Sequence, residues 1–171
     1  MNPKFARFVL ASALAAGVST LTIGRLSYAD DATGGPASEP ASAAMTPLER
    51  VNATPRGELK NPYAVEGDTI QEGHKLFFSY GCSGCHGGTG GGGMCPPVNG
   101  DVWFYGLADD TLFRLVTLGS VGLQGAGFQR LGGKGLQMPA FSEIIKSEDD
   151  LWKILTWVRS VYKGDPKKKT W

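Results

Sequence analysis

Apolar side chains recur at the three- and four-residue spacing of an α-helix in three stretches of this chain. These stretches cover residues 69–80, 111–118 and 148–163. The positions that we expect to face inward are Ile70, Leu76, Phe77, Tyr80, Leu112, Leu115, Val116, Leu151, Ile154, Leu155, Val158 and Val161. The pattern predicts an all-α fold in which the first and last of these helices bury their apolar faces.

Acidic residues, a serine and a glycine mark where these helices begin and end. Asp68 and Ser147 are the expected N-caps of the first and last helix, and Asp109 and Asp110 are expected to cap the middle one. We expect Gly119 to end the middle helix and to begin a glycine-rich loop.

Gly73 falls in the middle of the first predicted helix. A glycine there destabilises a helix by about 1 kcal/mol relative to alanine. The close approach of another helix would explain its presence. We therefore expect Trp157 or Tyr162 of the last helix to pack over Gly73, so that the two terminal helices cross.

The N-terminal 29 residues are predicted to be a targeting segment. Lys4 and Arg7 precede an apolar run, and small residues lead up to Ala29. This order is typical of a secretory signal peptide, which we assign to residues 1–29, and it predicts export to the periplasm. The alternative is an uncleaved membrane anchor, for which the apolar run is nearly long enough.

The rest of the chain divides by composition. Residues 30–60 are rich in Ala, Pro, Gly, Ser and Thr and predict a flexible linker. The folded domain is then 61–164, and 165–171 form a short basic tail. Without the first 29 residues the chain carries 14 basic and 16 acidic side chains, a formal charge of −2. This balance does not suit a nucleic-acid-binding protein.

The run Cys82–His86, with the sequence C-S-G-C-H, carries the clearest chemical signal. Two thiols at this spacing can add to the two vinyl groups of a haem, and the histidine that follows is then held beside the iron. The run predicts one covalently attached haem c. Cys82 and Cys85 would be its thioether anchors, and His86 the proximal ligand of the iron.

Two other kinds of site use similar residues. Cys82, Cys85 and Cys95 with one histidine would complete a Cys3His zinc site. A thioredoxin-like redox pair is the other alternative, although no βαβ pattern surrounds the motif. If the first two cysteines carry haem, Cys95 is left either packed near the haem or available for an intermolecular disulfide.

Met138, followed by Pro139, is the second chemical marker. It comes after a long loop and before the last helix, a position that favours ligation of the iron opposite the histidine. Met45 lies in the predicted linker, and Met94 is too near His86 in the sequence to reach the other face easily. His74 is a further possible sixth ligand, but its place on the helix leading into the motif favours a surface role.

The segment after the motif supplies further candidates for haem contact. A glycine run follows His86, but no Gly-Lys-Ser/Thr follows it, so a phosphate loop is excluded. A carbonyl near the Pro96–Pro97 pair is expected to accept the Nδ1–H of His86. Pro97 and Trp103 are candidate cofactor contacts, the indole N–H reaching a haem propionate or, alternatively, the ring simply packing in the core.

With these features placed, the domain resembles a class I cytochrome c, in which an N-terminal and a C-terminal helix cross around one covalent haem. The resemblance covers about 61–164. More narrowly, four stretches resemble the cytochrome c-L group, and within it the members that serve lanthanide-dependent methanol dehydrogenases. These stretches are Cys82–Gly88, Met94–Pro97, Asp109–Leu115 and Ile144–Ile154.

The resemblance implies a periplasmic one-electron carrier rather than an enzyme. Its donor would be a PQQ-dependent methanol or alcohol dehydrogenase, and its acceptor a downstream cytochrome c or an oxidase. No nucleic acid and no membrane anchor would be involved after signal cleavage. Two alternatives stay open, namely a haem enzyme or sensor with an open sixth coordination position, and an electron carrier that serves a different dehydrogenase.

Overall fold

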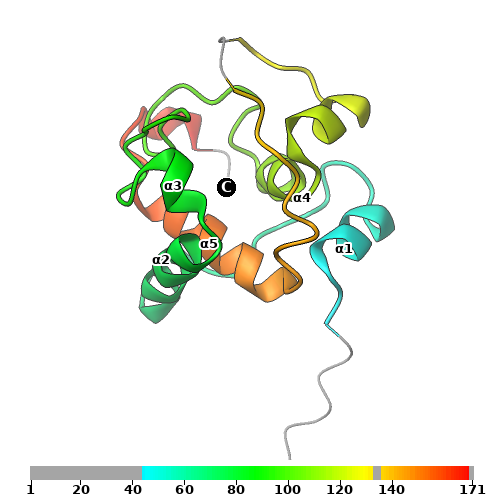
Figure 1. Cartoon of the computed structure of the whole chain (residues 1–171), viewed down its shortest axis with the longest axis horizontal. Helices are drawn as coiled ribbons and strands as arrows, with labels where there is room; N and C mark the ends of the chain where they lie inside the picture. The colour runs from blue at the N-terminus through cyan, green and yellow to red at the C-terminus, as the bar shows by residue number, and fades with distance from the viewer. Residues whose placement is uncertain (1–43, 133–135, 170–171) are drawn as a thin grey trace, which may run out of the picture. The chain divides into compact units, whose positions relative to one another are not determined.

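The computed structural model describes residues 44–132 and 136–169. Within these residues it contains helices and no strand, which confirms the predicted all-α class (Figure 1). The helices are α1 (Pro47–Ala53), α2 (Asp68–Ser79), α3 (Cys82–His86), α4 (Asp109–Gly125), α5 (Glu148–Ser160) and the 3-10 helix η1 (Pro166–Lys168).

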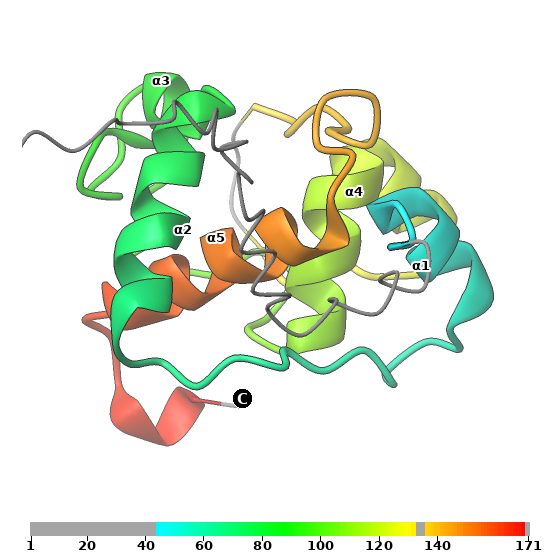
Figure 2. The ribbon, with the colours of Figure 1, turned by 90° about the horizontal axis from the view of Figure 1, so that it is seen from below.

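The crossing of α2 and α5 is the main helix contact, as expected, and Figure 2 shows the two helices running at a steep angle to each other. Gly73 lies at the contact point. A Cβ atom there would lie 2.0 Å from the main-chain oxygen of Lys153 and 3.1 Å from the Cβ atom of Trp157. The glycine is therefore needed for the close approach, and Trp157 is the residue that packs over it.

The starts of α5 and α2 agree closely with the pattern, whereas α5 ends at Ser160, three residues earlier than predicted. Ser147 is the N-cap of α5, and its hydroxyl accepts the main-chain N–H of Asp150. The N-cap of α2 is Gly67 rather than Asp68, which is the first residue of the helix.

The middle helix is longer than predicted because Gly119 interrupts it without ending it. Gly119 has φ 69° and ψ 173°, and helical structure resumes after it as far as Gly125. The residue was expected to stop the helix because glycine commonly does so. Here main-chain groups of residues 138–141 form hydrogen bonds with residues on either side of Gly119, and the chain is helical again after it.

The prediction of a flexible linker over residues 30–60 is wrong for residues 44–60, where the chain folds onto the domain. Thr46 caps α1, with Pro47 in the first turn and Glu49 completing a capping box. Pro47 and Val51 are buried. The segment folds onto the domain because a side chain of α4 binds its main-chain oxygens. Amino-acid composition does not reveal such contacts.

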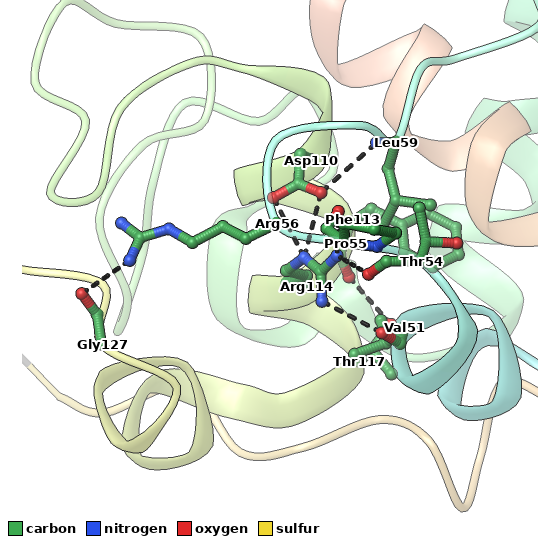
Figure 3. A network of polar contacts seen from close by, with 10 residues as sticks. All are labelled: Val51, Thr54, Pro55, Arg56, Leu59, Asp110, Phe113, Arg114, Thr117 and Gly127. Atoms are coloured by element: carbon green, nitrogen blue, oxygen red, sulfur yellow. Dashed lines mark hydrogen bonds and ion pairs between the residues drawn. The ribbon is translucent and has the colours of Figure 1, made fainter.

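Arg114 of α4 provides that anchor (Figure 3). Its guanidinium donates to the main-chain oxygens of Val51 at 3.1 Å, Thr54 at 2.7 Å and Pro55 at 3.0 Å. The same group is paired with the buried carboxylate of Asp110 at 3.0 Å. The buried guanidinium of Arg114 thus holds α1 and the turn after it against α4.

Asp109 and Asp110 do not cap α4, which corrects the sequence-based expectation, and the N-cap is Ala108. Asp109 is buried and ion-paired with Arg159 of α5, and it accepts the main-chain N–H of Asn61 at 3.0 Å. Asp109 therefore joins α4 to α5, whereas Asp110 pairs with Arg114 of its own helix and accepts the main-chain N–H of Leu59 at 3.3 Å.

The predicted signal peptide, residues 1–29, lies outside the described residues. In the part of the chain that the structure describes, no helix combines the length and the apolar character needed to cross a bilayer.

Candidate functional site

One cavity gathers most of the residues that the sequence marked. Its empty volume is about 920 Å³, a figure that includes the open space at its mouth. Its lining is largely apolar and comes from α2, α3, the segment 96–106, α4, the segment 136–138 and α5. The lining residues that matter below are Phe77, Cys82, His86, Pro97, Val102, Trp103, Phe104, Tyr105, Ser120, Leu136 and Met138.

Two of these segments face each other across the space between the helices. Figure 1 shows α3, which carries the C-x-x-C-H motif, on one side, and the segment that leads from residue 136 into α5 on the other. His86 and Met138 both line the cavity. They therefore approach the same space from two different parts of the fold.

His86 is held in one tautomer. Its Nδ1 lies 2.8 Å from the main-chain oxygen of Pro96. A carbonyl oxygen only accepts, so Nδ1 must carry the proton, and the lone pair of Nε2 is left free for a metal. The expectation that a carbonyl of the Pro96–Pro97 pair would orient the ring is confirmed.

Cys82 lines the cavity, whereas Cys85 is not among the lining residues. Cys82 and His86 are four residues apart and therefore lie on the same side of the short helix α3. Burial raises the pKa of the Cys82 thiol to about 11, so the neutral thiol is the stable form.

Cys95 lies beside Cys85 of the motif. Its main-chain N–H donates to the oxygen of Cys85 at 3.0 Å. The pKa of the Cys95 thiol is raised to about 11, first by burial and then by its contact with the Cys85 thiol. The third cysteine is thus half-buried next to the motif, as the packed alternative anticipated.

Pro97 and Trp103, the two further candidates for cofactor contact, both line the cavity. The indole N–H of Trp103, however, donates to the main-chain oxygen of Gly100 at 2.6 Å. This bond corrects the idea that the N–H reaches a haem propionate, because its hydrogen is already used within the loop.

His74 is not among the residues that line the cavity. Its ring stacks on Trp157 with centroids 4.6 Å apart, and its Nε2 lies 2.9 Å from the main-chain oxygen of Gly88. The residue is half-buried between α2, α5 and the glycine loop rather than on the surface. Its place speaks against a role as sixth ligand.

The described residues contain no cluster of donor side chains for the alternative zinc site. Among residues 44–132 and 136–169, no three side chains of His, Cys, Asp or Glu come together in a way that would hold a metal ion.

A haem fits this site on three observations. The cavity is apolar and open on one side, it contains a thiol of the attachment motif, and it contains an imidazole whose Nε2 is available together with a thioether. These two donors are the pair that holds six-coordinate haem iron in many electron-transfer cytochromes.

The sequence reasoning did not identify Ser120 as part of the site. It is a buried polar residue that directly follows the interruption of α4 at Gly119. The sequence signal that could have identified it is a serine directly after a glycine in an otherwise apolar helical stretch.

The sequence model of the family described as "Cytochrome C oxidase, cbb3-type, subunit III" matches residues 68–158. Cytochrome c-L of Methylorubrum extorquens is 25% identical over 114 residues, which are 66% of this chain and 50% of that protein. The chain therefore aligns with about half the length of this relative.

A solved structure, cytochrome cL from the marine methylotrophic bacterium Methylophaga aminisulfidivorans, is 26% identical, with a TM-score of 0.51 over 81% of this chain and 78% of that one. The fold is that of a class I cytochrome, and the family implies a haem c cofactor. The chain belongs to the cytochrome c family, and within it the chain resembles the cytochrome c-L group.

Proposed function

We propose that this chain is a periplasmic, mono-haem c-type cytochrome that carries single electrons. One observation carries the proposal, namely that a single apolar cavity contains Cys82, His86 and Met138. A haem bound there supplies a reversible one-electron couple. Cys82 and Cys85 are the proposed thioether anchors, although Cys85 is not among the lining residues, and His86 and Met138 are the proposed axial ligands.

The residues of this chain support electron transfer rather than bond-making chemistry. The Pro96 carbonyl fixes the orientation of His86, and a fixed pair of axial ligands keeps the iron environment similar in both oxidation states. The apolar lining excludes water from most of the cofactor surface. An open sixth position, as in a haem enzyme or sensor, would require Met138 to be a packing residue only.

The mouth of the cavity has the character of a weak docking surface. Val102 and Leu136 line the cavity and are 65% and 60% exposed. Apolar side chains at the rim let a partner approach the cofactor edge through a small, transient interface, below about 1,200 Å².

We further propose a PQQ-dependent methanol or alcohol dehydrogenase as the electron donor and a downstream cytochrome c or oxidase as the acceptor. The likeness to the cytochrome c-L group supports this choice, and the methylotrophic source of one such relative agrees with it. Export to the periplasm rests on the sequence of residues 1–29.

The first test is the absorption spectrum of the purified protein, oxidised and reduced. We expect sharp haem c bands on reduction and, in the oxidised form, the weak near-infrared band of a sulfur–iron bond. Haem bands without the sulfur band, together with carbon monoxide binding that displaces no ligand, would favour the open-site alternative.

The second test is rapid mixing with substrate-reduced dehydrogenases. Reduction of the cytochrome by a PQQ-dependent methanol dehydrogenase should be much faster than reduction by an unrelated quinoprotein dehydrogenase. The opposite order would leave the electron-carrier assignment intact and replace the donor.

A further inference from the structure

Both main-chain polar groups of Met138, its N–H and its carbonyl oxygen, form hydrogen bonds with one residue, Ser120. The main-chain N–H of Met138 donates to the Ser120 hydroxyl oxygen at 3.0 Å. In return, the main-chain N–H of Ser120 donates to the oxygen of Met138 at 2.8 Å. Ser120 is 4% exposed and lines the same cavity as the methionine.

The interruption of α4 makes these bonds possible. In an unbroken helix the N–H of Ser120 would donate to the oxygen of Val116, four residues earlier. Instead, the Val116 oxygen accepts the N–H of Phe141 at 3.0 Å. Both groups that α4 releases at Gly119 are thus satisfied by the segment 138–141.

Gly119 also sets how closely that segment can approach. A Cβ atom at Gly119 would lie 2.6 Å from the nitrogen of Ala140 and 2.8 Å from the oxygen of Met138. These neighbours are main-chain atoms, which cannot rotate out of the way. The segment therefore packs directly on the backbone of α4.

We propose that Ser120 is the positioning residue that holds Met138 in place as the sixth ligand of the haem iron. The inference rests on the proposed His86/Met138 ligation. Leu136, Gln137, Pro139 and Ala140 around the methionine are exposed, so side-chain burial gives this segment little support. The pair of bonds to Ser120 acts on Met138 itself, whereas the Phe141–Val116 bond holds the segment three residues further on.

The test compares Ser120→Ala with the wild-type haem protein. Alanine leaves the N–H of Met138 without its acceptor, so the thioether should leave the iron more readily, by about tenfold. The pH at which the near-infrared sulfur band disappears should fall by about one unit. Ser120→Thr, which keeps the hydroxyl, should restore the wild-type value.

Thr117→Val is the matched control. Thr117 lies one turn earlier in α4, is 1% exposed, and its hydroxyl donates to the oxygen of Phe113 at 2.8 Å. This variant also loses one buried hydrogen bond, but that bond does not involve the segment 138–141. It should lower stability without moving the pH midpoint of the sulfur band.

The outcomes separate the two proposals. If the wild-type protein shows no sulfur band, the ligation by Met138 fails, whatever Ser120 does. If the band is present and Ser120→Ala loses it at the wild-type pH, the role of Ser120 is disproved.

If Ser120→Ala does not fold, hydrogen exchange in the wild-type haem protein decides. The amide of Met138 should exchange as slowly as amides inside α4. Exchange as fast as that of the neighbouring exposed Gln137 would overturn the proposal.

Discussion

Gly73 of α2 lies against the main-chain oxygen of Lys153 of α5, so closely that a Cβ atom would come within 2.0 Å of it. The contact is between two backbones, and neither can move without shifting a whole helix. The position of α2 relative to α5, and with it the cavity wall that Phe77 supplies, depends on this glycine.

The substitution Gly73→Ala should therefore destabilise the protein, although alanine is the better helix former. We expect a loss of roughly 1–3 kcal/mol or more in the free energy of unfolding, because the extra methyl group overpacks a backbone contact. Urea unfolding of the haem protein measures it. Gly125→Ala is the control, since Gly125 also lies in a helix and a Cβ atom there meets nothing within 4 Å. Equal stability of the two variants would contradict this account.

Met138→Ala should remove the sulfur–iron band and lower the reduction potential. Axial ligands set haem potentials over roughly 0.8 V, and we expect a fall on the order of 100 mV here. Spectroscopy and a redox titration check both effects. Met94, which is 69% exposed, provides the control. Met94→Ala should change neither quantity, and a change there instead would reassign the ligand.

Arg114→Met should cost about 3–5 kcal/mol, because it leaves the buried carboxylate of Asp110 without its partner. It also removes the donor for three main-chain oxygens, one in α1 and two in the turn that follows it. Arg50→Met is a suitable comparison. The side chain of Arg50 is 38% exposed in its pair with Glu148, and its loss should cost at most about 1 kcal/mol. Denaturant unfolding of both variants decides whether burial makes the difference.

Tyr80 predicts a pH dependence of stability. Its hydroxyl donates to Asp150 at 2.6 Å, and this bond, followed by burial, raises the pKa of Tyr80 to about 12. The folded pKa lies above the unfolded one, near 10. The stabilisation is therefore complete below pH 10 and is lost as the pH rises towards 12.

Tyr80→Phe lacks the titrating group and should be less stable than the wild type at pH 7 by about 1 kcal/mol. That difference should shrink between pH 10 and 12. A stability difference that stays constant from pH 8 to 12 would show that the bond to Asp150 contributes nothing.

The features that sequence revealed are those set by local spacing. The apolar repeat defined α2 and α5, Ser147 was correctly placed as a cap, and the mid-helix glycine pointed to Trp157. The C-x-x-C-H run and the later methionine identified two walls of one cavity, because each marker is a short motif with its own chemistry.

The features that sequence missed depend on partners far along the chain. The sequence predicts a helix end at Gly119, since nothing local shows that residues 138–141 bond to the groups freed at the interruption. It predicts a linker over residues 44–60, because the segment is held by its carbonyl oxygens, which every residue carries, and not by a recognisable side-chain pattern. The capping box of Thr46 and Glu49 was a local signal for α1 that composition concealed.

The bond between His86 and Pro96 has a consequence for how the redox behaviour of this protein can be altered. The acceptor is a main-chain oxygen, so replacing the side chain at position 96 leaves it in place. If His86 binds the haem iron as proposed, the electron-donating strength of its imidazole is therefore little affected by point substitutions at position 96. A change in the length or path of the glycine loop between the two residues would alter this bond, and with it the reduction potential.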